Sequence, residues 1–303
     1  MTNPLFKGII AYPITPFDDA EKVDLPLFKK LTERLISTGA HAIAPLGSTG
    51  VLPYLGDEEK EAVTEAAVKQ AAGRVPVLAG VSNLTTERTV YHARFAEKAG
   101  ADAVMIIPMS YWKLTDDEIF RHYDTVASNI SIPIMAYNNP ATGGVDMSTG
   151  LLRRLLQIPN VTMVKESTGD VQRMHTLYNE LGGEAAFYNG SNPLALAAFA
   201  AGAKGWCTAA ANLVPSLNKA LYEAVERNDL QLAQQLFYRQ LPLLRFIVAK
   251  GLPRAVKAGL HLLGEDGGNL RSPLQPLAAD EMRELHTILS DMGEHTVLDQ
   301  QFI

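Results

Sequence analysis

The sequence contains a single cysteine, Cys207, which excludes an internal disulfide and fits a reducing compartment. It has no cluster of basic residues, and its net charge of −6 argues against a nucleic-acid partner. No apolar run approaches the ~18 residues that a membrane-spanning helix needs. The first residues also lack the pattern of a secretory signal peptide. These absences predict a cytoplasmic protein that binds neither nucleic acid nor membrane.

Metal and nucleotide motifs are missing as well. The seven histidines are scattered, and none has a spacing typical of a metal site. There is neither a G-x-G-x-x-G motif nor a Walker loop, so the sequence does not support a nucleotide cofactor. We therefore expect no metal and no cofactor. Most histidines fall within expected helices, where we expect them to face solvent.

What the chain does contain is a strand-like pattern that recurs about every 30 residues. Each repeat is a short apolar run rich in β-branched residues, as is typical of parallel strands that are covered on both faces. The eight runs cover residues 8–13, 42–46, 76–81, 103–107, 133–137, 161–164, 186–188 and 205–208.

Amphipathic patterns with helix-start signals separate these runs. Asp57 is expected to cap a helix through residue 71, and a later helix is expected to end at Gly182 and Gly183. Alternating strands and helices at this length favour an α/β fold of the (β/α)8 TIM-barrel type over residues 1–227, with an open doubly wound sheet as the alternative. Residues 228–303 are expected to form a C-terminal helical region.

Lys165 is the most informative single residue. It follows the apolar run 161–164, and an ammonium group near a core is costly unless it is paired or deprotonated. A deprotonated lysine amine can form a Schiff base with a ketone. The alternative is a lysine at a strand end that reaches back to solvent.

Other polar groups stand where strands of such a barrel end, which is the rim that carries the active site in this fold. Strand two leads into Gly47-Ser-Thr-Gly, a loop whose amides and hydroxyls can bind an anion. The remaining strand ends add a phenol at Tyr137, a hydroxyl and an amide in the segment Gly190, Ser191 and Asn192, and a hydroxyl at Thr208. Their expected convergence with Lys165 favours the Schiff-base interpretation.

These motifs, in this order and spacing, resemble the family of pyruvate-dependent class I aldolases and lyases that includes dihydrodipicolinate synthase and N-acetylneuraminate lyase. The resemblance covers nearly the whole chain. It depends on G-S-T-G at 47–50, Y-N-x-P at 137–140, K-E-S-T-G-D at 165–170, and the stretch 202–215 with G-W-C-T.

The resemblance implies a role for each matching residue. Lys165 would be the Schiff-base lysine, Tyr137 the proton-relaying phenol, and Ser48 the hydroxyl that links it to a second tyrosine. In relatives that tyrosine comes from a neighbouring subunit, and Tyr111 is the best match. The loop at Gly47, Ser48 and Thr49 would hold the keto-acid carboxylate, and the backbone near Cys207 would lie against the bound keto acid. Ser167, Ser191, Asn192 and Thr208 would face the variable half of the substrate.

The sequence departs from that pattern at three places. Thr142 stands where dihydrodipicolinate-forming relatives carry an arginine for a second carboxylate, which argues against that synthesis. Ser191 and Asn192 replace the carboxylates of the neuraminate lyases, which argues against sialic acid. Val51 stands where a glutamate is common, and Trp112 is placed to narrow the mouth of the site.

Three hypotheses follow. The first is an aldolase or lyase that joins pyruvate to an unidentified aldehyde, or cleaves a 2-keto-3-deoxy or 4-hydroxy-2-keto acid. The second is a dehydratase for a sugar-derived keto acid that uses the same lysine imine. The third, from another class, is a catalytically silent keto-acid-binding or regulatory protein. The partners expected are a small 2-keto acid and an aldehyde, and the resemblance suggests a homotetramer built from dimers.

Overall fold

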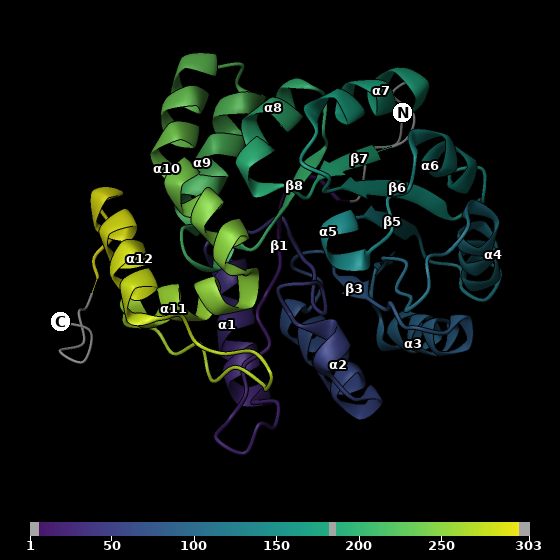
Figure 1. Cartoon of the computed structure of the whole chain (residues 1–303), viewed down its shortest axis with the longest axis horizontal. Coiled ribbons are helices and arrows are strands. Elements are labelled where there is room, and N and C mark those ends of the chain that lie inside the picture. Colours follow the sequence, from purple (N-terminus) through teal and green to yellow (C-terminus); the bar gives the residue numbers. More distant parts are fainter. Residues whose placement is uncertain (1–5, 182–185, 297–303) are drawn as a thin grey trace.

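The computed structural model describes residues 6–181 and 186–296, and its eight strands are all parallel (Figure 1). They form one sheet in the order β2-β1-β8-β7-β6-β5-β4-β3. Ile43 also bridges to Val77, and its amide donates to the Pro76 carbonyl at 3.0 Å, which joins β2 to the β3 side. The sheet therefore closes, and the expected (β/α)8 barrel is confirmed. The strands are β1 (Gly8–Ala11), β2 (Ala42–Ile43), β3 (Leu78–Gly80), β4 (Ala103–Ile106), β5 (Ile134–Asn138), β6 (Val161–Glu166), β7 (Ala186–Asn189) and β8 (Gly205–Thr208).

Helices follow the strands and cover the outside of the barrel. Side-chain caps at Asp24, Thr85, Thr115 and Ser148 start four of them. The helices are α1 (Leu25–Ser37), α2 (Asp57–Ala71), α3 (Thr86–Ala99), α4 (Asp116–Ala127), α5 (Pro140–Gly143), α6 (Thr149–Leu155), α7 (Val171–Leu181), α8 (Ala195–Ala200) and α9 (Pro215–Glu226). Short 3-10 turns, η1 (Leu52–Tyr54), η2 (Asn192–Leu194) and η3 (Ala210–Asn212), lie in three of the loops.

Three further helices end the described chain: α10 (Leu230–Lys250), α11 (Leu252–Leu262) and α12 (Ala279–Asp291). They lie together on one side of the barrel, where α10 packs on α9 and on both of the other two (Figure 1). Buried residues of these helices belong to the same apolar cluster as residues of β1, α1 and α2. The C-terminal helices are thus continuous with the barrel core, and the boundary at residue 227 stays a prediction.

The barrel interior is a separate, smaller cluster of side chains. It contains alternate residues of the strands, among them Ile10, Met105, Met135 and Met163. Because strand side chains alternate between faces, the residue two positions further along each of these strands also points inward. That spacing places Tyr12, Tyr137 and Lys165 near the carboxyl ends of the strands, inside the barrel.

Two sequence expectations are wrong in detail. Asp57 is not a cap: Gly56 occupies the N-cap position of α2, and the Asp57 carboxylate instead accepts hydrogen bonds from Arg88 and His92. His92 does not face solvent, because only 5% of it is exposed beneath that carboxylate. Gly182 and Gly183 lie outside the described residues.

No helix in the described ranges is both long and apolar enough to cross a membrane.

Candidate active site

Lys165 lies within β6, not beyond its end, and points into the barrel. Only 4% of the residue is exposed. Its Nζ lies 4.0 Å from the centre of the Tyr12 ring and 3.8 Å from the centre of the Tyr137 ring. Two aromatic faces therefore hold the amine by cation–π contact, away from bulk water. The alternative of a lysine that reaches back to solvent is excluded by this burial.

Tyr137 stands beside Lys165 because β5 and β6 pair in a register that aligns the two residues. Its hydroxyl accepts a hydrogen bond from Asn139 Nδ2 at 2.8 Å and lies 3.4 Å from Ser48 Oγ. Burial raises the pKa of Tyr137, but the Lys165 ammonium and the hydrogen bonds from Asn139 and Ser48 together outweigh it. The pKa of Tyr137 therefore lies below its usual value. A phenol with this surrounding is suited to proton transfer.

The neighbouring residue Glu166 points to the outside of the barrel and anchors this strand end. Its carboxylate is fully buried and accepts hydrogen bonds from Asn138 Nδ2 at 3.1 Å and from the Thr168 amide at 2.7 Å. The Arg173 guanidinium of α7 lies 3.5 Å away. These contacts join the ends of β5 and β6, so they fix the positions of Tyr137 and Lys165 relative to each other.

The Gly47-Ser-Thr-Gly loop carries backbone strain at both flanks. Leu46 has a φ of 60° and Val51 a φ of 50°, a left-handed conformation that is costly for bulky and β-branched residues. Gly47 is required by space, since a Cβ there would lie 2.4 Å from Cδ1 of Tyr12. Thr15 Oγ1 donates to the Gly50 carbonyl at 2.8 Å and helps to hold the loop. Strain of this kind is typical of functional loops.

Gly190 and Ser167 lie against Lys165 from the other side. A Cβ at Gly190 would lie 1.8 Å from Ser167 Oγ and 2.8 Å from Lys165 Cε, so only glycine fits here. The Ser167 hydroxyl is buried and makes no hydrogen bond of normal geometry among the described atoms, although it lies close enough to the Tyr137 hydroxyl to help lower the pKa of that phenol. Such a group is available to a ligand, because buried polar atoms normally have partners.

Cys207 lies in β8 and faces the barrel interior, 4% exposed. Burial raises the pKa of its thiol, and the nearby Lys165 ammonium and Tyr12 hydroxyl oppose this only in part. The side chain is therefore a neutral thiol, as expected for a packing residue rather than a nucleophile.

Three other expected substrate contacts have partners within the protein. Asn192 is 2% exposed, and its Oδ1 accepts a hydrogen bond from Trp206 Nε1 at 3.1 Å. Thr208 Oγ1 accepts one from the Ala210 amide at 3.0 Å. The backbone amide of Ser191 donates to Asn189 Oδ1. None of the three lines the cavity described next.

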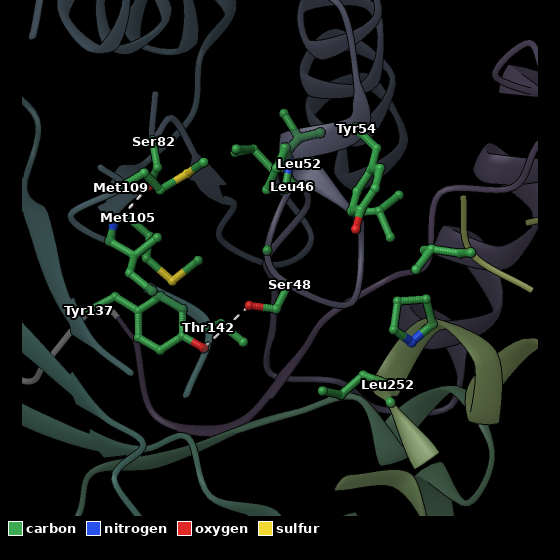
Figure 2. Close-up of a pocket in the computed structure, with 17 residues that line it drawn as sticks. Leu46, Ser48, Leu52, Tyr54, Ser82, Met105, Met109, Tyr137, Thr142 and Leu252 are labelled. Atoms are coloured by element: carbon green, nitrogen blue, oxygen red, sulfur yellow. Dashed lines mark hydrogen bonds between the residues drawn. The ribbon is translucent and has the colours of Figure 1, made fainter. Parts of the chain in front are cut away.

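A cavity of about 490 Å³ opens next to Tyr137 and Ser48 (Figure 2). Lys165 is not part of its lining and lies behind the Tyr137 ring. The walls come from the loop after β2, from β4 and its loop, and from the C-terminal helical region. The lining residues are Leu46, Gly47, Ser48, Val51, Leu52, Pro53, Tyr54, Ser82, Met105, Ile107, Met109, Tyr137, Thr142, Gly251, Leu252, Pro253 and Leu274.

Tyr111 and Trp112 lie on the loop after β4 and project from the surface. They are 90% and 77% exposed and contact each other edge to face. Neither lines the cavity of its own chain, so Trp112 does not narrow the mouth within one chain. Tyr111 likewise does not join Tyr137 and Ser48 within a single subunit.

Two residues beside the reacting groups were missed by sequence reasoning. Tyr12 contacts Lys165, but in sequence it ends an apolar run and looks like core. Asn139 bonds the Tyr137 hydroxyl, and its place in the Tyr-Asn-Asn-Pro turn was the available signal. The described ranges contain no group of three or more His, Cys, Asp or Glu residues that could hold a metal ion.

Comparison with known proteins agrees with this geometry. The profile of the dihydrodipicolinate synthetase family matches residues 5–292. The chain belongs to this family. The family is one of pyruvate-dependent, Schiff-base-forming aldolases and lyases, so the chain is an enzyme of the class I aldolase type.

Individual relatives cover almost the full length. The 4-hydroxy-tetrahydrodipicolinate synthase of Parvibaculum lavamentivorans is 36% identical over 275 residues, which is 91% of this chain and 94% of that protein. A Pseudomonas aeruginosa protein, provisionally named a dihydrodipicolinate synthetase, has a crystal structure that superposes with a TM-score of 0.93 at 53% identity, covering 95% of this chain and 99% of that one. The Aquifex aeolicus dihydrodipicolinate synthase superposes with a TM-score of 0.92 at 31% identity, covering 97% and 100%.

Proposed function

We propose that this enzyme forms an imine between Lys165 and pyruvate and uses it to make or break a carbon–carbon bond with an aldehyde. The observation that carries the proposal is the position of the Lys165 amine, buried between Tyr12 and Tyr137 next to a cavity. A structure of an Acinetobacter baumannii dihydrodipicolinate synthase, 31% identical to this chain, is described as complexed with pyruvate. That resemblance supports pyruvate as the keto acid.

The chemistry runs as follows in the synthetic direction. The unprotonated Lys165 amine attacks C2 of pyruvate, water leaves, and an iminium forms. Loss of a proton from C3 gives an enamine, whose C3 attacks the aldehyde carbon while the carbonyl oxygen takes up a proton. Hydrolysis then releases a 4-hydroxy-2-keto acid and the free amine. Tyr137 is the group placed to move these protons, a role worth typically ~10²–10⁴-fold in rate.

The remaining site residues would orient the keto acid. Ser48 and Thr49, with the amides of the loop that begins at Gly47, would hold the carboxylate, and the buried Ser167 hydroxyl would contact the bound substrate. The backbone at Cys207 would lie against the bound keto acid. Fixing the carboxylate orients C2 toward the amine, which supplies part of the rate acceleration.

Borohydride reduction in the presence of pyruvate tests the proposal. We expect a covalent adduct on the peptide that contains Lys165, and none after Lys165→Ala. Lys257 is an internal control, because burial lowers its pKa to about 7 and so increases the fraction of reactive, unprotonated amine. An adduct on Lys257 alone, or no adduct in folded protein, would overturn the assignment and favour a binding protein without turnover.

Product analysis separates aldol cleavage from dehydration. Retro-aldol cleavage of a 4-hydroxy-2-keto acid releases pyruvate, whereas dehydration of a keto-deoxy sugar acid releases none. Thr142, which is exposed at the cavity, offers no positive charge for a second carboxylate. We therefore expect an aldehyde that carries a carboxylate to be a poor partner despite the names of the relatives.

A further inference from the structure

The cavity beside Tyr137 is lined by uncharged residues, and the proposed function does not specify which aldehyde it would accept. All seventeen lining residues belong to the described part of the chain, and none of them carries a charge. Leu46 and Leu52 lie on one side of the cavity, Met105 and Met109 on another, and Leu252 on a third (Figure 2). Leu274 also lines the cavity. The cavity surface is therefore uncharged and consists mostly of hydrocarbon and thioether groups.

The polar side chains of the cavity are all hydroxyls, those of Ser48, Tyr54, Ser82, Tyr137 and Thr142. The hydroxyls of Ser48 and Tyr137 lie 3.4 Å apart at the end nearest Lys165. Ser82 Oγ accepts the Ile107 amide at 2.8 Å. A carboxylate or a polyhydroxylated chain entering the apolar part would lose water without gaining partners, which is unfavourable. An alkyl or aryl group would gain from burial there.

The C-terminal helical region contributes this apolar surface and is held firmly in place. Arg271 donates to both oxygens of Glu59 at 2.6 and 2.8 Å and to the Tyr54 carbonyl at 2.9 Å. The backbone amide of Asn269 donates to the Phe17 carbonyl at 2.7 Å. The loop that presents Leu274 is thus tied to the barrel, so the apolar wall is preformed.

We infer that the aldehyde partner carries an uncharged, apolar substituent, and that Leu252 is a specificity-determining residue for it. This inference rests on the proposed function. In the synthetic direction C3 of the pyruvate enamine forms a bond to the aldehyde carbon, the carbonyl electron pair goes to oxygen, and Tyr137 supplies the proton. The product is a 4-hydroxy-2-keto acid with an apolar group on C4, and cleavage is the reverse.

A homologous series of aldehydes tests the inference. With pyruvate saturating, kcat/KM should rise by about three- to fivefold for each methylene added from propanal to hexanal, which is the gain expected for burying one CH₂. Benzaldehyde should be accepted, whereas succinic semialdehyde and glyceraldehyde should be at least tenfold poorer than hexanal. A flat or falling series, or a preference for either polar aldehyde, would overturn the inference.

Variants locate the effect in the cavity. Leu252→Gln should flatten the series, while Val248→Gln, at an exposed apolar position of α10 outside the cavity, should leave it unchanged. A series that stays steep in Leu252→Gln would contradict the role given to Leu252. Borohydride trapping with pyruvate is measured in parallel: an adduct on Lys165 with no apolar preference refutes this inference alone, and absence of any adduct refutes the proposed function as well.

Discussion

At the scale of single residues, the site brings a lysine amine and a phenol together inside a shell of aromatic and aliphatic side chains. The Lys165 ammonium favours the ionised form of Tyr137 in a place where burial alone would oppose it. Asn139 adds a hydrogen bond from outside the pair. Proton transfer at Tyr137 should therefore be tuned by Asn139, a residue that does not line the cavity.

Asn139→Ala tests that tuning. The Asn139 amide group donates to the Tyr137 oxygen at 2.8 Å and so lowers the pKa of the phenol. Its removal should raise that pKa, and the limb of the kcat profile that reports Tyr137 should move to higher pH. Measurement of kcat against pH checks this. A limb that stays in place would show that Asn139 only supports the turn, and borohydride trapping should be retained in either case.

Gly190→Ala addresses the space beside the amine. The added Cβ would lie 1.8 Å from Ser167 Oγ and 2.8 Å from Lys165 Cε, so the lysine must shift. Since a misplacement of ~1 Å at a reacting group can cost ~10²-fold in rate, we expect a loss of that order. Gly150→Ala is the matched control, because its nearest neighbour would be 3.8 Å away. Equal, near-unchanged turnover in both variants would contradict the tight packing.

The sequence was most informative at residues that conflict with their surroundings. Lys165 was found because a charge in an apolar run requires a reason, and Gly47 and Gly190 because they interrupt strand ends. Tyr12 was missed because an aromatic residue that ends an apolar run is indistinguishable from core. The roles expected for Asn192 and Thr208 came from their position in sequence, which does not reveal that Trp206 and Ala210 bond their side chains.

At the scale of elements, the loop of residues 264–276 connects α11 to α12 and also completes the cavity. The sequence predicted that the C-terminal region around this loop is helical, since helix signals are local. It could not show that Leu252 and Leu274 line the same cavity as Leu52 and Met109, because these residues lie far apart along the chain. The apolar character of the site was therefore visible only in three dimensions.

Arg271→Ala tests the tie between this loop and the barrel. The hydrogen bond from Arg271 holds the pKa of Glu59 below its usual value. The pair therefore stabilises the folded state at pH values above the pKa of an unfolded-state glutamate, and this stabilisation is lost as the pH falls through the lowered pKa. At pH 7 we expect the variant to lose ~1–3 kcal/mol of unfolding free energy, as for hydrogen bonds to charged groups. Denaturant titrations at pH 7 and below the Glu59 pKa check this. A difference that persists undiminished in acid would contradict the assignment to the ion pair.

At the scale of the whole molecule, the exposed pair Tyr111 and Trp112 lies outside the cavity of its own subunit. Tyr111 is 90% exposed on the loop after β4, and Trp112 beside it is 77% exposed. Large aromatic groups exposed together mark an interaction site on many proteins. The family resemblance proposes that this tyrosine completes the relay of Tyr137 and Ser48 in a neighbouring copy, which would make the oligomer part of the catalytic unit.

Complementation between two inactive variants decides this. Tyr111→Phe and Lys165→Ala should each be inactive or severely slowed alone. If Tyr111 acts across the interface, co-expressed mixed oligomers regain activity, because the intact Lys165 of one copy then meets the intact Tyr111 of the other. If Tyr111 acts within its own chain, every site in the mixture lacks one of the two groups and activity does not return. Because the mixed oligomers contain only the two variants, recovery of turnover can arise only from a site shared between subunits.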